Sequence, residues 1–218
     1  MTRALALVAV PGIEERVVVD LLRVQSDGNH RYDLPLHFNG HIIDTGPDFA
    51  VNRTTRPVLG DGHGYQHIWV DGQATAQDRP FLTWQTGNRF HSWHWVPQPG
   101  STVILGESGA NDPGFNLRRE PMLIQRVEGG RNLLFAGALE SHGYYDADTE
   151  RVSQSSSRIA AIRSASFDDA DIMVISTLAG ARIAIAIAHD MSATAQHQVE
   201  FEGHAIAWTG PAARIILP

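Results

Sequence analysis

Histidine is the residue type in this sequence that most readily suggests chemistry, since the chain has 11 histidines and no cysteine. His37 and His41 stand four residues apart, and Asp44 follows them. On a helix this spacing would place both rings on one face, where they could bind zinc. Pro35 and Gly40 disfavour a helix, and on a strand the two positions lie ~13 Å apart, too far to bind one ion directly. The alternative is that both histidines form local hydrogen bonds.

A second group combines a phenol with an imidazole. Tyr65 and His67 immediately precede the apolar run Ile68–Val70. A tyrosine beside a histidine could act as the acid–base pair that abstracts a proton next to a uronate carboxylate. The other interpretation, which we favour, is an aromatic entry into the following strand.

The most aromatic segment alternates along a predicted strand. His91, Trp93 and Trp95 fall on one face, and His94 falls on the other. Such a face could stack on sugar rings, but more often it belongs to the core or to a contact between sheets. We favour the core interpretation.

The segment Ser108–Pro121 is unusually rich in Gly, Asn, Asp and Pro, which predicts an ordered loop held by side-chain-to-backbone hydrogen bonds. Arg118 and Arg119 precede Glu120. The two arginines could form a salt-bridge network with Glu120 or bind a carboxylate in a bidentate manner. The sequence contains no nucleophile elbow, phosphate-binding glycine loop or zinc-protease helix motif.

Composition limits the kind of partner. The net charge is −7, and the 17 basic residues are all arginines scattered along the chain, which argues against nucleic acid and against binding a polyanion unaided. No stretch approaches the ~20 apolar residues of a membrane span, and the run Leu5–Val10 is too short for a signal peptide. As written, the chain is expected in the cytoplasm, or in the periplasm if its natural start lies upstream of Met1.

The hydrophobic pattern has a period of two and predicts an all-β, multilayered antiparallel β-sandwich with turn signals every ~8–12 residues. Turns are predicted at Ser26–Asn29, Asp71-Gly72, Gly87-Asn88 and Gly203-His204. The predicted strands are Arg16–Val24, His67–Val70, Phe81–Trp84, Arg89–Val96, Thr102–Leu105, Met122–Val127, Leu133–Leu139, Arg158–Ser164, Ile172–Leu178, Arg182–Ala188, Gln198–Glu202, Ala205–Thr209 and Arg214–Leu217.

One strand has a distinctive pattern. In Arg182–Ala188, isoleucines alternate strictly with alanines, which favours a strand buried on both faces, one large and one small. The polar, serine-rich region Asp146–Ser157 is predicted to be a surface loop, and we find no linker or repeat. The chain is therefore expected to form one domain over residues 1–218.

Several ordered stretches resemble the C-terminal region of the oligoalginate lyases, within the heparinase II/III-like superfamily, and span roughly Leu5–Val152. The resemblance is expected to fade beyond Val152. The stretches are Tyr32–His41 with Asp44-Thr45, Gly64–Trp69, Gly87–Phe90, Gly109–Pro121 and Leu139–Asp146.

The resemblance implies a β-sheet domain that follows a helical toroid, in enzymes that cleave uronate polysaccharides by β-elimination. The family's Asn-His pair, catalytic tyrosines and structural zinc ligands would all precede Met1. We therefore assign no catalytic residue and no metal ligand, and Tyr65 and His41 are given neither role. No cofactor is expected in this chain, because the zinc site would lie upstream.

The sequence thus predicts a β-sandwich domain of an alginate or oligoalginate lyase, inactive alone and completed by a toroid-bearing partner. Its ligand would be a uronate oligosaccharide or polysaccharide, with neither nucleic acid nor membrane as partner. The alternative is a non-catalytic carbohydrate-binding or assembly module, for which Trp84, Trp93 and Trp95 would need to face solvent. A third hypothesis, independent activity from the histidine clusters, rests on motifs alone.

Overall fold

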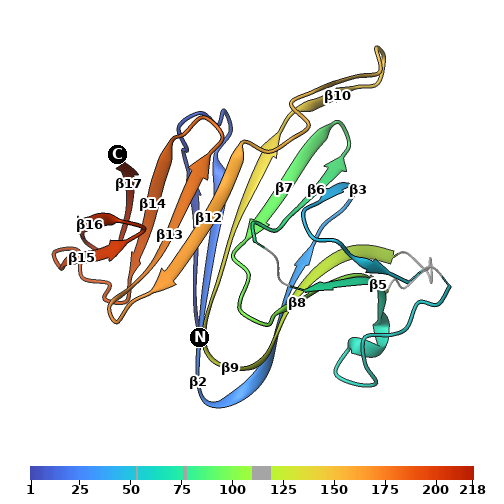
Figure 1. The fold of residues 1–218 in the computed structure, drawn as a ribbon, viewed down its shortest axis with the longest axis horizontal. Helices are drawn as coiled ribbons and strands as arrows, with labels where there is room; N and C mark the ends of the chain where they lie inside the picture. Colours follow the sequence, from blue (N-terminus) through green and yellow to red (C-terminus); the bar gives the residue numbers. More distant parts are fainter. Residues whose placement is uncertain (53, 76–77, 110–118) are drawn as a thin grey trace.

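The computed structural model describes residues 1–52, 54–75, 78–109 and 119–218, and these confirm the all-β prediction (Figure 1). The one helical element among them is a short 3₁₀ turn, η1, and no described helix could cross a membrane. The elements are β1 (Thr2–Val8), β2 (Val17–His37), β3 (His41–Thr45), β4 (Ala50–Val51), η1 (Tyr65–His67), β5 (Ile68–Thr75), β6 (Phe81–Thr86), β7 (Arg89–Trp95), β8 (Thr102–Gly109), β9 (Arg119–His142), β10 (Tyr144–Asp146), β11 (Arg151–Ser153), β12 (Ile159–Ser166), β13 (Ala170–Thr177), β14 (Arg182–Ala188), β15 (Gln196–Phe201), β16 (His204–Thr209) and β17 (Ala212–Leu217).

Two very long strands, β2 and β9, pair antiparallel along almost their whole lengths. Pairing runs from Val18 opposite Leu139 to His37 opposite Met122, with register shifts around His30. Both strands bend together at the bottom of Figure 1. The turn predicted at Ser26–Asn29 was wrong, because the irregularity is absorbed as bulges, which bend a strand without ending it. The two strands predicted between Met122 and Leu139 are likewise the two halves of β9.

The large sheet contains nine strands, in the order β3-β6-β7-β9-β8-β5-β4, with β2 beside β9 and β1 beside β2. Residues 137–142 of β9 pair with β7, and residues 119–126 pair with β8, so these neighbours diverge at the bend. The predicted turn at Gly87-Asn88 is confirmed between β6 and β7. The one predicted at Asp71-Gly72 was wrong, since Gly72 lies within β5, at a register shift.

A second sheet, β12-β13-β14-β17, packs on β1, β2 and β9 to form the main core. Ile183 and Ile185 of β14 point into this core, beside Val19. Ala184 and Ala186 point to the other side, where the β15–β16 hairpin covers them and builds a third layer. The prediction that β14 has one large and one small buried face is confirmed. The turn of this hairpin lies at residues 202–203, one residue before the predicted position.

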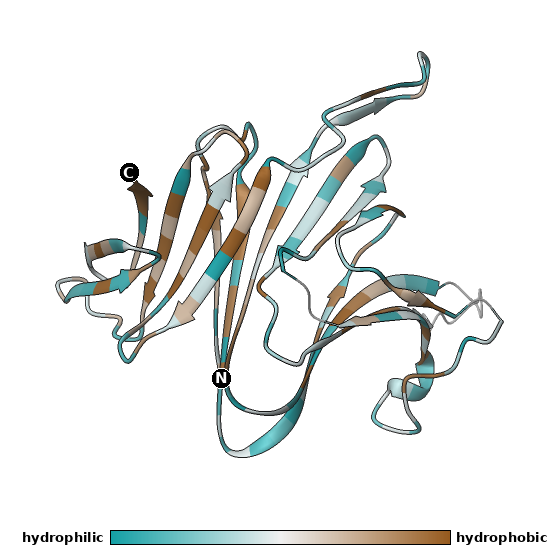
Figure 2. Cartoon of the chain, in the orientation of Figure 1, coloured by the Kyte–Doolittle hydropathy of each residue, from teal (hydrophilic) through white to brown (hydrophobic). Residues whose placement is uncertain are grey.

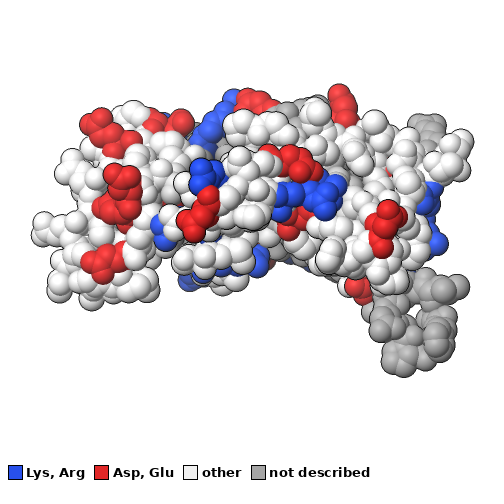
Figure 3. Space-filling model, turned by 90° about the horizontal axis from the view of Figure 1, so that it is seen from below, with Lys and Arg blue, Asp and Glu red and all other residues white. Residues whose placement is uncertain are grey.

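Apolar and charged side chains are distributed unevenly over the molecule. Figure 2 shows apolar residues concentrated on β12, β13 and β14, whereas β7 carries mainly polar colours. Acidic and basic side chains are interspersed on the face shown in Figure 3, with acidic groups toward the end that bears β15 and β16. That face offers no single-sign surface of the kind that nucleic acid requires.

Gly137 of β9 makes room for a buried tryptophan of the neighbouring strand. A Cβ atom at this position would lie 2.0 Å from the ring of Trp93, which is 5% exposed and packs with Trp84 and Trp95. The missing side chain thus leaves space over β9 for the indole of Trp93, which belongs to the paired strand β7.

We therefore expect Gly137→Ala to destabilise the fold, because the buried indole cannot move away without disturbing its cluster. Overpacking of this kind costs about 1–3 kcal/mol or more in the free energy of unfolding, measured by urea denaturation. Gly62→Ala is the control, since an added Cβ there meets nothing within 4 Å. Equal midpoints for the two variants would contradict this packing role.

Candidate functional site

His37 and His41, the candidate metal pair, are both exposed and lie at the end of β2 and the start of β3. Among the residues that the structure describes, no group of three His, Cys, Asp or Glu side chains is arranged to hold an ion. The zinc hypothesis at His37 and His41 thus gains no support from the geometry.

Tyr65 is part of a clasp between η1 and the central strands. Its hydroxyl donates to Oδ2 of Asp33 at 2.5 Å, and Arg126 donates to both oxygens of Asp33 at 2.8 and 2.7 Å. Burial alone would raise the pKa of Asp33, but the bonds from Arg126 and Tyr65 outweigh it and lower that pKa. The bond to Asp33, followed by burial, raises the pKa of Tyr65, so this phenol is not poised to act as a base. His67 is exposed.

The three tryptophans that were candidates for a sugar-binding face are core residues. Trp84, Trp93 and Trp95 are all buried in one cluster, which confirms the core interpretation and removes them as a solvent-facing sugar platform. His91 stacks on Trp84 with ring centres 5.5 Å apart, and its Nδ1 bonds Oγ of Ser141. Burial, then His142 and Arg89, lowers the pKa of His91.

Most of the predicted loop Ser108–Pro121, including Arg118, lies outside the described residues. Arg119 is described: its guanidinium lies 4.9 Å from the ring centre of Trp69 and 3.5 Å from a carboxylate oxygen of Glu107. At Arg119 the structure thus shows an ion pair and a ring contact inside the chain.

The most unusual chemistry is a row of polar side chains across one face of the large sheet. Asp44, Thr83, Ser92 and Glu140 are successive cross-strand partners on β3, β6, β7 and β9. The last three are buried, at 3%, 0% and 1% exposure. We call these four residues the polar row. They lie on the same face of the large sheet as the apolar core and continue it toward β3.

Hydroxyl groups of the row form a directed chain. The oxygens of Thr83 and Ser92 lie 2.7 Å apart, Ser92 Oγ lies 2.8 Å from His142 Nε2, and His142 Nδ1 lies 2.8 Å from the carbonyl oxygen of Gln154. A carbonyl only accepts, so Nδ1 of His142 carries the proton. In the neutral ring Nε2 then accepts from Ser92, which in turn accepts from Thr83.

Glu140 anchors the segment that crosses above the row. Its Oε2 accepts from the Ser157 hydroxyl at 2.5 Å and from the backbone N–H groups of Arg158 and Ile159 at 2.9 and 3.4 Å. Because the Ser157 proton points to Glu140, the 2.8 Å contact from His94 Nε2 must donate to Ser157. The histidine therefore does not activate Ser157, and the trio is not a nucleophilic triad.

His94 is held neutral by its surroundings. Burial, followed by the nearby His142, lowers the pKa of His94 to about 4. A neutral ring with its proton on Nε2 agrees with the bond to Ser157.

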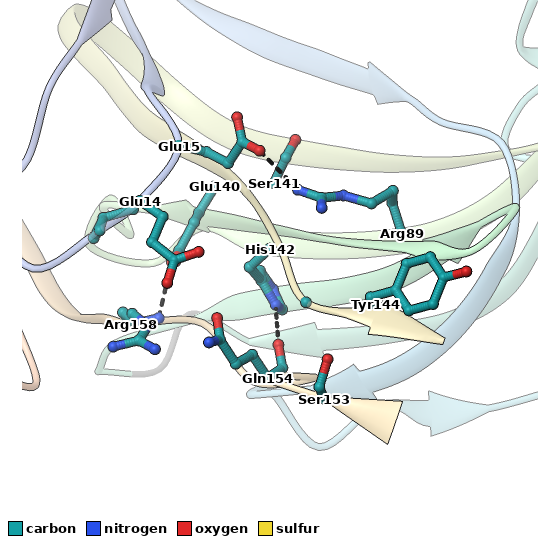
Figure 4. A pocket seen from close by; sticks show the side chains of 12 residues that line it. Glu14, Glu15, Arg89, Glu140, Ser141, His142, Tyr144, Ser153, Gln154 and Arg158 are labelled. Carbon is teal, nitrogen blue, oxygen red and sulfur yellow. Dashed lines mark hydrogen bonds and ion pairs between the residues drawn. The ribbon is translucent and has the colours of Figure 1, made fainter. Parts of the chain in front are cut away.

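The crossing segment, residues 153–158, lines several cavities, and two of them also contain members of the polar row. One, of about 160 Å³, is lined by Glu14, Glu15, Arg89, His142 and others (Figure 4). Figure 4 shows Arg89 directed toward Glu15, to which it donates at 3.1 Å. Because carboxylates and guanidinium groups share this wall, the cavity suits a polar ligand more than a simple anion.

The second cavity, of about 290 Å³, lies at the Asp44 end of the row and is lined by Phe81, Thr83, His94 and residues 155–157. Sequence reasoning missed both cavities. It placed Glu140 and His142 only within a family stretch, and it treated the serine-rich region as a plain surface loop. Three inward polar residues on separate strands become recognisable as a group only once their register is known.

The chain was compared with known proteins. A family model described as "Exo-oligoalginate lyase-like, C-terminal domain" matches residues 179–215. An alginate lyase of Stenotrophomonas maltophilia (strain K279a) is 42% identical over 215 residues, which is 98% of this chain but 29% of that protein. An exo-oligoalginate lyase of Saccharophagus degradans (strain 2-40 / ATCC 43961 / DSM 17024) is 35% identical over 212 residues, 95% of this chain and 29% of that protein.

The fold and the buried polar row define a layered β-sheet domain. The matches identify it as related to the C-terminal domain of exo-oligoalginate lyase-like proteins, as the resemblance predicted. The chain spans 29% of the length of these relatives. The prediction that the resemblance fades beyond Val152 was wrong, because the family match itself begins at residue 179.

Glu140→Ala should destabilise the fold by about 2–4 kcal/mol, because it leaves buried donors without an acceptor. Glu128→Ala, at an exposed position of the same strand, should change the free energy of unfolding by less than about 0.5 kcal/mol. Urea denaturation measures both. A small effect at Glu140 would show that the crossing segment does not depend on this carboxylate.

Stability should also depend on pH through His94. Its folded pKa of about 4 lies below the ordinary 6.5, so between these values the unfolded chain binds a proton that the folded chain does not. The free energy of unfolding should therefore fall by up to about 3 kcal/mol as the pH drops through this window. His94→Gln should flatten that slope, whereas His37→Gln, at an exposed site, should keep it. Unchanged slopes in both variants would contradict the prediction.

Proposed function

We propose that this chain forms the β-sheet part of a uronate polysaccharide lyase of the alginate or oligoalginate type and has no turnover by itself. The observation that carries this proposal is similarity along 98% of the chain to an alginate lyase of which it spans 29%. The rest of such an enzyme, expected to be a helical toroid, would supply the catalytic groups.

The chemistry of the described residues supports this assignment. β-Elimination needs a base at the carbon next to the carboxylate and an acid at the leaving oxygen. Tyr65 donates to Asp33, and its pKa is raised. His94 and His142 are engaged in buried hydrogen bonds that hold the crossing segment. These groups serve the fold in the described part of the chain.

One surface suits a docking partner. Leu5 and Leu7 of β1 are 64% and 60% exposed, on the face of the large sheet that points away from the main core. Beside them is a largely apolar cavity lined by Leu22, Val24 and Phe135. Exposed apolar area of this kind marks an interaction surface, so we place the remainder of the enzyme against it.

The test is a domain exchange. This chain replaces the matching segment of the alginate lyase relative, and absorbance of new unsaturated uronate ends is followed with oligoalginate. We expect turnover by the exchanged protein and none by the chain alone. Turnover by the chain alone would refute its dependence on a partner, and a folded but inactive exchange protein would refute its role as the lyase β-sheet part.

A further inference from the structure

The cavity at the Asp44 end of the polar row is lined by both apolar and polar side chains. Phe81, Ile159 and Leu178 supply the apolar part of the lining, and Leu178 is 71% exposed. Phe81 is held in place: its ring centre lies 5.8 Å from that of His94, and a Cβ on Gly46 would come within 2.9 Å of its ring. The aromatic surface is therefore fixed before any ligand arrives.

The polar part of the lining begins beside Phe81, because Thr83 follows on the same face of β6 and His94 is the cross-strand partner of Phe81. His94 is 7% exposed, is fixed through its bond to Ser157, and lines the cavity together with the buried hydroxyl of Thr83. Ser155 and Ser156 add hydroxyl groups, which both donate and accept hydrogen bonds. These polar groups can form hydrogen bonds with the hydroxyl groups of a ligand, and the ligand need not be charged.

Two charged groups complete the lining. Asp44 supplies an exposed carboxylate, and Arg79 supplies a guanidinium whose side chain is 62% exposed. Asp78 lies 3.8 Å from Arg79 and is itself 3.1 Å from Arg163, so Arg79 is held only loosely by its neighbour. A guanidinium at a rim can bind a ligand carboxylate through two parallel hydrogen bonds.

These features together match one class of ligand. A pyranose ring presents C–H groups that pack on an aromatic face and hydroxyl groups that bond to serine and carboxylate, and a uronate adds one carboxylate. The volume of about 290 Å³ lies at the small end of ligand sites, which start near about 300 Å³, and suits a single sugar ring.

We propose that this cavity binds one uronate unit of an oligosaccharide, with Phe81 as the stacking platform and Arg79 as the carboxylate ligand. The choice of a uronate rests on the proposed function, whereas the choice of a sugar rests on the lining, which combines an aromatic ring with hydroxyl and imidazole groups.

The experiment is titration calorimetry on the whole chain, at low salt, with a mannuronate trisaccharide and with maltotriose as a neutral probe. The trisaccharide of uronates should bind at least tenfold more tightly than maltotriose. Phe81→Ala should weaken the binding of the uronate at least tenfold. Arg79→Asn should weaken it at least fivefold and leave maltotriose unchanged. Asparagine is used because Arg79 has a φ of 55°, a conformation that asparagine tolerates.

Matched controls are Tyr144→Ala, an exposed aromatic outside this cavity, and Arg151→Asn, an exposed arginine on β11. Both should bind like the parent chain, and denaturation midpoints establish that every variant is folded.

Three outcomes would overturn the proposal: no binding of the uronate trisaccharide, equal binding of both sugars, or binding that Phe81→Ala and Arg79→Asn leave unchanged. None of these depends on turnover. The domain exchange can therefore fail while this binding persists, and the reverse also holds.

Discussion

The continuous pairing of β2 with β9 is the constraint on which the rest of the structure depends. One half of this pair supports the apolar contact with β12, β13 and β14, and the other half carries β8. Because β7 and β8 pair with different halves of β9, the bend determines how far apart they lie. Gly137 lies in the half of β9 that pairs with β7, where it leaves room for the indole of Trp93 to lie over the backbone.

Beyond the apolar core, the same sheet face becomes polar, and a different kind of interaction takes over. Glu140 is almost fully buried, and it accepts hydrogen bonds from Ser157 and Arg158 of the crossing segment and from Ile159 at the start of β12. Satisfied networks of this kind specify one arrangement, because an unpaired partner inside a low-dielectric region is costly. The crossing segment is thereby fixed, and both cavities take their shape from it. The candidate site thus results from the hydrogen bonds that hold the crossing segment over the polar end of the large sheet.

Much of the fold could be predicted because it is local. Period-two patterning located most strands, and the Ile/Ala alternation of β14 correctly predicted two buried faces of different size. The errors have one origin. Ser26–Asn29 and Asp71-Gly72 consist of residue types that favour turns. Pairing with distant strands nevertheless continues β2 and β5 through them, with register shifts in place of turns. The polar row escaped prediction because its members are far apart in the chain and meet only through cross-strand register.

The sequence by itself determined the all-β class, the strand patterns and the similarity to oligoalginate lyase-like proteins, since these reside in residue order. Only the tertiary structure decided that Trp84, Trp93 and Trp95 are all buried. It also decided that Tyr65 donates a hydrogen bond to Asp33 and that Ser157 receives one from His94. The reason is physical: burial and hydrogen-bond direction depend on which strands become neighbours. Which strands become neighbours is determined by the packing of the whole chain, and local sequence patterns do not show it.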